Sequence, residues 1–234
     1  MNNKKFLKLI NFLVGKLIPI WETGKPPHNE KNWGPHYTFP NSERPVSVGL
    51  IEAFFLHNIT KLINAKSGFE IGSGFGYSSW WIGHALRSGE WFGSIDNYSE
   101  GSNHLEKIKF ITFAKETLEL GNTHYYNGTS PSDLKKIIGQ KELDIVFIDG
   151  HHYQDAPLSD FKEILNFVNE KSIIVMHDIQ DKYTVNKALD YANEINWQIE
   201  YLSTSCGMAV VSKNEIKCKI NKAYYEAQKL KLLN

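Results

Sequence analysis

Apolar and polar positions alternate in a way that predicts helices and strands in regular succession from Val46 onward. Short apolar runs bounded by turn residues indicate buried strands, whereas apolar residues three and four positions apart indicate helices. The run 143–149 is apolar at almost every interior position, which is typical of a strand covered on both faces. In chain order we expect helix 46–64, strand 68–72, helix 78–87, strand 91–96, helix 105–120, strand 123–127, helix 132–138, strand 143–149, helix 155–168, strand 172–176, helix 184–194, strands 197–202 and 207–212, and helix 214–233.

This succession predicts a parallel α/β sandwich that closes with a hairpin of two strands. In such folds ligands bind outside the carboxyl ends of the strands. The repetition spans residues 46–212, which we interpret as one domain, and residues 213–234 are expected to add a helix with a solvated, lysine-rich face.

The first 45 residues have a different pattern. Residues 1–21 combine lysines with apolar residues three and four positions apart, which predicts an amphipathic helix. We expect this helix to pack on the domain or on a second subunit of a homo-oligomer, and the alternative is association with a membrane surface. Residues 20–45 are rich in proline and aromatic residues, so they are interpreted as an ordered segment that covers either the active site or the outside of the core.

Composition excludes several classes of protein. The 234 residues carry 26 Lys and Arg against 26 Asp and Glu, so a general nucleic-acid-binding surface is disfavoured. Cys206 and Cys218 form neither a disulfide framework nor a zinc motif, which favours a cytoplasmic setting. The apolar runs near the start fall well short of the roughly 20 residues that cross a bilayer, so no stable membrane insertion is expected.

A glycine-rich turn between a predicted strand and a predicted helix is the strongest chemical signal. Glycines there let the backbone turn tightly and approach a cofactor, and the following helix offers unpaired N–H groups. The third glycine comes one residue earlier than in the dinucleotide motif GxGxxG, and no Lys-Ser/Thr pair of a P-loop follows. The next strand ends in Asp96, at a suitable distance to bind both ribose hydroxyls. The turn comprises Glu70, Gly72, Ser73, Gly74, Gly76 and Tyr77.

These residues resemble the first two motifs of the class I S-adenosylmethionine-dependent methyltransferases. The resemblance covers roughly residues 46–212 and implies a Rossmann-like doubly wound sheet, mostly parallel, with an antiparallel last strand and helices on both faces. It implies S-adenosylmethionine as the cofactor. The implied cofactor-binding residues are Glu70, Gly72, Ser73, Gly74, Gly76 and Tyr77 in the turn, Asp96 and Asn97 at the ribose, Gly128, Thr129 and Ser130 at the adenine, and Asp149.

Two further segments, 147–155 and 175–178, resemble a subgroup of small-molecule O-methyltransferases that includes enzymes acting on sugar hydroxyls and proteins of the cephalosporin hydroxylase type. Its fourth strand usually ends in Ile-Asp-Gly-x-His-x-Tyr. Here Tyr153 directly follows His152, so this loop departs from the usual spacing and weakens the substrate inference.

Methyl transfer to an alcohol needs a base or a cation that favours the alkoxide, since an alcohol proton has a pKa of about 16. Asp149 and Asp178 end neighbouring predicted strands, and two carboxylates there suit Mg²⁺ or a similar ion. Asp149, His152 and His177 are the candidate catalytic residues, with the histidines as bases. Alternatively, Asp149 bonds to cofactor or backbone without a metal, and Asp178 caps the next element.

The sequence therefore predicts an S-adenosylmethionine-dependent O-methyltransferase for a small hydroxylated molecule such as a sugar or glycan precursor. Two alternatives stay open: a non-catalytic binding module with the same fold, and a nicotinamide-dependent oxidoreductase, against which the glycine spacing argues.

Overall fold

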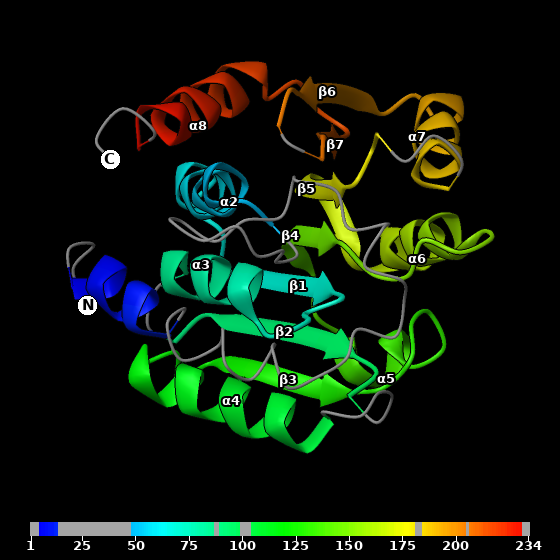
Figure 1. Ribbon diagram of the computed structural model, residues 1–234. Helices are drawn as coiled ribbons and strands as arrows, with labels where there is room; N and C mark the ends of the chain where they lie inside the picture. Colours follow the sequence, from blue (N-terminus) through cyan, green and yellow to red (C-terminus); the bar gives the residue numbers. More distant parts are fainter. Residues whose placement is uncertain are drawn as a thin grey trace.

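The computed structural model describes residues 5–13, 48–86, 89–98, 104–180, 184–204 and 206–230. Its centre is a seven-stranded sheet with helices on both faces (Figure 1). The strands are β1 (Ser67–Ile71), β2 (Trp91–Asp96), β3 (Thr123–Asn127), β4 (Leu143–Ile148), β5 (Val168–His177), β6 (Gln198–Leu202) and β7 (Met208–Ser212). The helices are α2 (Leu50–Leu62), α3 (Tyr77–Ala85), α4 (His104–Thr117), α5 (Leu134–Ile138), α6 (Ala156–Ile164), α7 (Val185–Glu194) and α8 (Lys217–Leu230).

The strand order is β3-β2-β1-β4-β5-β7-β6. The first five strands in this order pair in parallel, whereas β7 lies antiparallel to both β5 and β6. The order reverses between β1 and β4, so the loops that follow these two strands leave the sheet side by side. A reversal of this kind creates the crevice in which doubly wound sheets bind ligands. The predicted fold class is confirmed.

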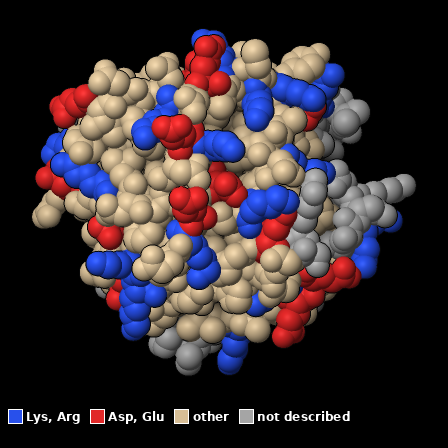
Figure 2. Space-filling view, turned by 180° about the vertical axis from the view of Figure 1, so that it is seen from behind, with Lys and Arg blue, Asp and Glu red and all other residues tan. Residues whose placement is uncertain are grey.

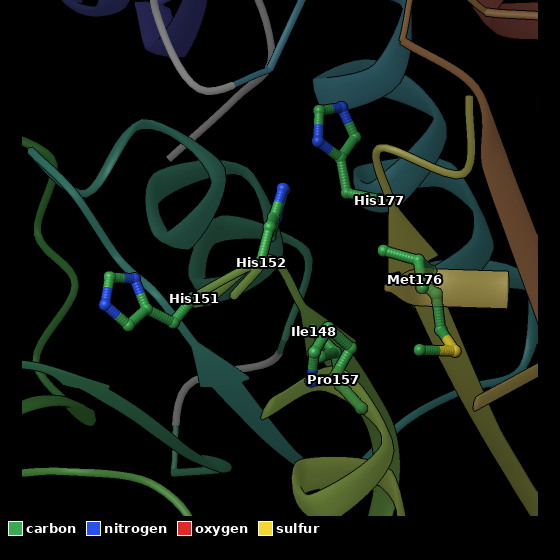
Figure 3. Close-up of a pocket in the computed structure, with 8 residues that line it drawn as sticks. Ile148, His151, His152, Pro157, Met176 and His177 are labelled. Atoms are coloured by element: carbon green, nitrogen blue, oxygen red, sulfur yellow. The ribbon is translucent and has the colours of Figure 1, made fainter. Parts of the chain in front are cut away.

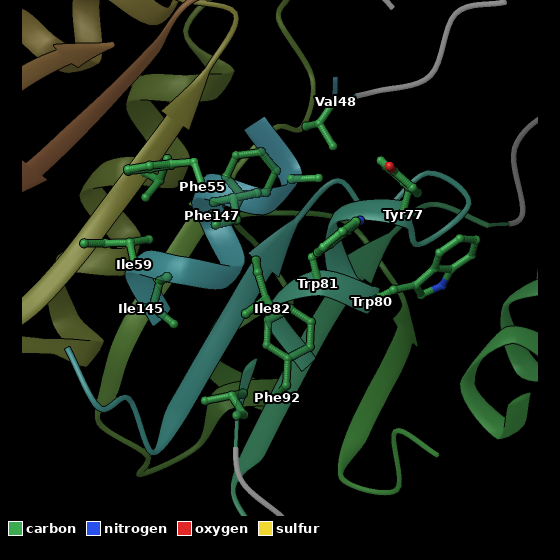
Figure 4. Packing of buried hydrophobic residues seen from close by; sticks show 14 of the residues in the cluster. Val48, Phe55, Ile59, Tyr77, Trp80, Trp81, Ile82, Phe92, Ile145 and Phe147 are labelled. Atoms are coloured by element: carbon green, nitrogen blue, oxygen red, sulfur yellow. The ribbon is translucent and has the colours of Figure 1, made fainter. Parts of the chain in front are cut away.

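Each face of the sheet has its own hydrophobic core. On one face the helical segment 5–13, α2, α3, α4 and α8 cover the strands, and on the other face α5, α6 and α7 do so. The first core is rich in aromatic side chains, and Figure 4 shows Trp81, Phe55 and Phe147 within it. Trp80 and Trp81 are both fully buried there. This packing fixes α2 and α3 against the sheet, and both helices supply residues to the site below.

The start of the chain contributes to the first core. Residues 5–13 are helical, and Phe6, Ile10 and Leu13 on one side of this helix are buried against α2, α3 and α4. The rest of the predicted amphipathic helix and the whole of the proline-rich segment 20–45 lie outside the described residues. Among the described helices, none combines the length and the apolar character that a bilayer-spanning segment needs.

The largest differences between predicted and observed boundaries are at the start of α2, which begins at Leu50 instead of Val46, and between α6 and β5. The helix expected over 155–168 ends at Ile164 and continues as a short 3₁₀ turn, and β5 begins at Val168 instead of Ser172. The polar residues 169–171 hide this part of the strand from a hydrophobicity pattern. Val168 nevertheless pairs with Leu143, across a shift in register between β4 and β5.

Charged side chains are interspersed on the face seen in Figure 2. Lysine and arginine residues alternate there with aspartate and glutamate, and neither sign gathers in an extended patch. This distribution agrees with the balanced charge of the sequence.

Candidate active site

The turn between β1 and α3 depends on its glycines. Gly72, Gly74 and Gly76 have φ angles of +88°, +53° and +85°, a region that L side chains rarely adopt. A Cβ atom on Gly72 would lie 2.1 Å from the backbone oxygen of Asp149. The glycine turn is therefore in direct contact with the end of β4, where the candidate catalytic residues begin.

Glu70 lies under this turn and is completely buried. Hydroxyl groups of Ser78, Ser79 and Ser94 donate hydrogen bonds to its carboxylate, the last at 2.6 Å. Burial raises the pKa of Glu70 to about 7, although the three hydroxyl groups oppose the rise. The structure thus places this predicted cofactor ligand where it ties α3 and β2 to β1. Tyr77, the first residue of α3, is also buried.

Asp96 ends β2 beside the turn, as the sequence predicts for a ribose ligand. Its Oδ2 accepts a hydrogen bond of 2.6 Å from the N–H of Gly74 and lies 3.4 Å from Nζ of Lys107. Ser73 in the turn bonds to the hydroxyl of Tyr98, which is buried two residues after Asp96. Asn97 lies between them and is partly buried. Tyr98 and Lys107 were missed by sequence reasoning, and an aromatic residue two positions after the acidic strand end was the available signal for Tyr98.

The loop after β3 reaches the same place. Gly128 donates a backbone hydrogen bond of 3.1 Å to the carbonyl of Asp96, and Thr129 donates one of 2.9 Å to the carboxylate of Asp133. Ser130 follows and is partly buried. Gly128, the first of the predicted adenine residues, is therefore in direct contact with the predicted ribose residue Asp96.

Asp149 follows β4 directly and lies against the glycine turn, with its N–H bonded to the carbonyl of Ile71 at 2.9 Å. Its side chain is only 5% exposed. Burial raises the pKa of Asp149, and attraction to His177 offsets part of the rise. Its Oδ2 atom has no hydrogen-bond partner among the described residues. A buried carboxylate oxygen without a donor is costly, so this atom marks a place for a bound cation or donor group.

His177 is enclosed by three carboxylates. Its Nδ1 lies 3.1 Å from Oδ1 of Asp149 and 3.2 Å from Oδ1 of Asp178, and its Nε2 lies 3.2 Å from Oε2 of Glu52. Burial by itself would lower the pKa of His177, but attraction to Asp149 and hydrogen bonds to the three carboxylates hold it well above its ordinary value. Both ring nitrogens face acceptors, so the ring is poorly placed to take a proton from a substrate.

His152 is the more accessible of the two predicted bases. Its side chain is 26% exposed, with Nδ1 at 3.4 Å from Oδ2 of Asp178 and Nε2 at 4.0 Å from Oδ1 of Asp149. Figure 3 shows that the rings of His151 and His152 point to different sides of a small pocket, as expected for neighbouring residues of an extended chain. His151 is exposed and lies edge-on against Tyr153. Only His152 therefore joins the cluster with His177.

Glu52 is the member of the cluster that sequence reasoning missed. It belongs to α2, 125 residues away from His177 in sequence, and is buried. The signal was its position on the helix, because it shares the buried face with Phe55, Leu56 and Ile59 at spacings of three, four and seven residues. A carboxylate on an apolar helix face needs a buried partner, and His177 is that partner.

The donor atoms suit a divalent cation. One ligand atom each from Asp149, His177 and Asp178 lies within 4.8 Å of the other two. Neighbouring ligands around an octahedral ion with bonds of about 2.1 Å lie about 3.0 Å apart, close to the observed separations. Together with the orphaned oxygen of Asp149, this geometry fits the predicted metal ligands Asp149 and Asp178.

Comparison with known proteins agrees with this description. The sequence model of a family described as a methyltransferase domain matches residues 69–179. No curated protein matches the sequence significantly.

Solved structures with a similar fold include the O-methyltransferase from Bacillus cereus in complex with SAH. It is 14% identical, with a TM-score of 0.61 over 91% of this chain and 92% of that chain. The O-methyltransferase TomG from Streptomyces achromogenes, involved in tomaymycin synthesis and solved with SAM, is 18% identical, with a TM-score of 0.54 over 68% and 78% of the two chains. A precorrin-6y C5,15-methyltransferase from Geobacter metallireducens is 12% identical, with a TM-score of 0.54 over 78% and 93%.

The sheet topology and the glycine turn with its acidic partner define a class I S-adenosylmethionine-dependent methyltransferase. Residues 69–179 match the model of the family described as a methyltransferase domain. The predicted enzyme class is confirmed at this level. The structural neighbours include proteins named O-methyltransferase and one named a C5,15-methyltransferase, so the acceptor has to be argued from the site.

Proposed function

We propose that this methyltransferase transfers the methyl group of S-adenosylmethionine to a hydroxyl group of a small molecule such as a sugar or glycan precursor. The observation that supports the proposal is the contact of the glycine turn at Gly72 with Asp149. A cofactor held by this turn would lie beside the cluster of Asp149, His152, His177 and Asp178. A methyl donor held by the turn and an acceptor held by the cluster would be neighbours, and such proximity accounts for several kcal/mol of barrier lowering.

The cofactor would be held along the carboxyl edges of β1, β2 and β3. Asp96 would accept hydrogen bonds from the ribose hydroxyls, and Gly128, Thr129 and Ser130 would lie against the adenine. The turn from Gly72 to Gly76 leaves room for the methionine part, because none of its glycines carries a side chain. Asn97 is the further residue proposed at the ribose.

The acceptor would be activated at the neighbouring edge. We assign His152 as the base that takes the hydroxyl proton, since its ring is the exposed one of the cluster and lies between Asp149 and Asp178. Asp149 and Asp178 would stabilise the imidazolium that forms. The methyl group then forms a bond to the acceptor oxygen as its bond to the sulfonium sulfur breaks, which leaves S-adenosylhomocysteine.

Asp149 and Asp178 are also the residues we propose to hold Mg²⁺ or a related divalent ion. When bound, such an ion polarises the acceptor oxygen and favours its deprotonation. Two observations support this role: two carboxylates follow adjacent strands, and one buried oxygen of Asp149 has no donor among the described residues.

We further propose a cytoplasmic setting and contacts between subunits through the first helix. In the described part of the chain, neither Cys206 nor Cys218 forms a disulfide. On the helix 5–13, Phe12 is 48% exposed and lies near Phe113, which is 43% exposed. Sedimentation of the intact protein and of a Phe12→Glu variant tests the subunit contact, and an unchanged mass would contradict it.

Two measurements test the function itself. Cofactor-free protein is expected to gain about 5–10 °C in unfolding midpoint with S-adenosylmethionine or S-adenosylhomocysteine at about 100 times the dissociation constant, and none with NAD⁺. Transfer of a labelled methyl group to a panel of hydroxylated acceptors is then measured with and without chelator.

Chelator is expected to abolish transfer while cofactor binding persists. Full transfer in chelator would remove the metal from the proposal. The absence of any shift with either sulfur ligand would instead favour a non-catalytic module.

A further inference from the structure

We propose that His177 is a third metal ligand through Nδ1, that Glu52 is the residue that positions it, and that the site therefore selects a first-row transition dication over Mg²⁺. This inference rests on the metal part of the proposed function. It adds a nitrogen donor and a buried carboxylate from α2 to the two strand-end aspartates.

The first step is the direction of the imidazole ring. Nε2 faces Glu52 at 3.2 Å, so Nδ1 faces the pair Asp149 and Asp178, at 3.1 and 3.2 Å. Three electron-rich atoms this close together repel one another unless a positive charge lies between them. A single proton on Nδ1 cannot neutralise both carboxylates, and Oδ2 of Asp149 would still have no partner in the described part of the chain. A divalent ion would engage Nδ1 and both carboxylates together.

The second step concerns what holds the ring. A histidine that binds a metal through one nitrogen commonly donates the N–H of the other nitrogen to a carboxylate, which fixes its tautomer and orientation. Glu52 meets this requirement. Its carboxylate also accepts a hydrogen bond of 2.7 Å from the N–H of Gly49 and one of 3.4 Å from the N–H of Cys206. Glu52 is thereby fixed before any ligand arrives, and it fixes the ring of His177 in turn.

The third step is the preference for a metal. Mg²⁺ is bound mainly by oxygen atoms, whereas an imidazole nitrogen suits the later first-row ions. A set of two carboxylates and one imidazole matches ions such as Mn²⁺, Fe²⁺ and Co²⁺. A site that used only the two aspartates would lack the part of this preference that the imidazole nitrogen supplies.

The experiment uses the whole protein, freed of metal by chelator and dialysis, with Mn²⁺ and Mg²⁺ as probes. Calorimetry is expected to give a dissociation constant at least tenfold lower for Mn²⁺ than for Mg²⁺. Electron spin echo spectra of the bound Mn²⁺ are expected to show modulation from a directly coordinated nitrogen. This signal reports ligation by His177 independently of turnover.

Three variants distinguish the loss of the His177 position from a general loss of folded structure. Glu52→Ala is expected to lower Mn²⁺ affinity by about 10- to 100-fold, the usual effect of losing such a partner. Glu52→Gln keeps an acceptor for the N–H of His177 and should restore most of the affinity and the nitrogen signal. Asp144→Asn is the matched control, because this carboxylate also accepts backbone hydrogen bonds, from Lys66 and Ser67, but at the opposite edge of the sheet. It should leave Mn²⁺ binding unchanged.

Equal affinity for the two ions without nitrogen modulation would overturn the inference and leave a site of two aspartates. Failure of both ions to bind, with methyl transfer undiminished in chelator, would overturn it together with metal assistance but not methyl transfer. Binding of Mn²⁺ with nitrogen modulation in a protein that neither binds S-adenosylmethionine nor transfers methyl groups would support the inference and contradict the proposed function.

Discussion

Glu70 and Asp149 are buried carboxylates on the neighbouring strands β1 and β4, yet their surroundings differ. Glu70 pairs in register with Phe147, two residues before Asp149. Burial raises the pKa of both side chains. The carboxylate of Glu70 is surrounded by three serine hydroxyls, whereas that of Asp149 faces histidines and keeps one oxygen without a hydrogen-bond partner among the described residues.

The difference distinguishes Glu70, whose hydrogen bonds connect α3 and β2 to β1, from Asp149, which we propose to act in catalysis. Hydroxyl groups are neutral donors that reorient easily, so Glu70 is accommodated whether it is charged or protonated. The carboxylate of Asp149 is stabilised by a positive charge nearby. His177 supplies this charge when no metal is present, and a bound cation would supply it in the metal-bound protein. Burial alone therefore does not identify a catalytic carboxylate, and the nature of its partners does.

The variant Asp149→Asn gives the strongest test of the comparison between Glu70 and Asp149. It keeps the shape of the side chain and removes its negative charge. We expect the rate of methyl transfer to fall by about 100- to 1,000-fold, as when a preorganised electrostatic partner is lost. The measurement is the initial rate with saturating cofactor, and calorimetric binding of S-adenosylmethionine serves as the control. Retention of more than a tenth of the rate would place the chemistry elsewhere.

Glu70→Gln is expected to change stability and its pH dependence while leaving the transfer rate intact. The pKa of Glu70 is about 7 in the folded protein and 4.5 in the reference state, so the folded protein binds the extra proton between these values. The contribution of protonated Glu70 to the free energy of unfolding is therefore fully present below about pH 4.5. It is lost as the pH rises through about 7, a change of about 3 kcal/mol.

Denaturant unfolding of both proteins from pH 4.5 to 8 measures this difference. As the pH rises across this interval, the free energy of unfolding of the variant should increase by about 3 kcal/mol relative to that of the natural protein. The contributions of other titrating groups cancel in this difference. Parallel stability curves would show that Glu70 does not titrate there.

The variant Asp96→Ala tests a carboxylate that combines a structural and a proposed binding role. Asp96 accepts a hydrogen bond from the glycine turn and is also proposed to bind the ribose. Loss of charge-assisted hydrogen bonds is expected to weaken S-adenosylmethionine binding by about 1.5–3 kcal/mol. Calorimetry measures this loss, and Asp96→Asn should recover part of it. An unchanged affinity would remove Asp96 from the cofactor site.

Much of the fold could be predicted from local pattern, because buried strands and amphipathic helices leave their period in the sequence. The bounds of β2 and β3 agree with prediction at both ends. The start of β5 could not be predicted, because residues 169–171 are polar and lie where the register between β4 and β5 shifts, between the pair Leu143–Val168 and the pair Ile145–Ile173.

The site was predictable where it follows strand ends and unpredictable where it depends on packing. The glycine turn, Asp96, Asp149 and Asp178 all follow from the rule that ligands bind at the carboxyl edge. The contact of Glu52 with His177 depends instead on how α2 lies across the sheet, and residues 125 positions apart carry no local sign of it. The same holds for the bond between Ser73 and Tyr98, which requires the register of β1 with β2.

The packing of α8 on α2 has a consequence for the order in which the protein is completed during synthesis. Ile220, Ala223 and Ala227 of α8 are buried in the core that also contains Phe55 and Ile59 of α2. On the ribosome, α2 emerges before any strand of the sheet, whereas the helix that covers it emerges only after all seven strands. Helix α2, which carries Glu52, thus reaches its final packing only at a late stage of synthesis. The contact of Glu52 with His177 is completed at the same stage.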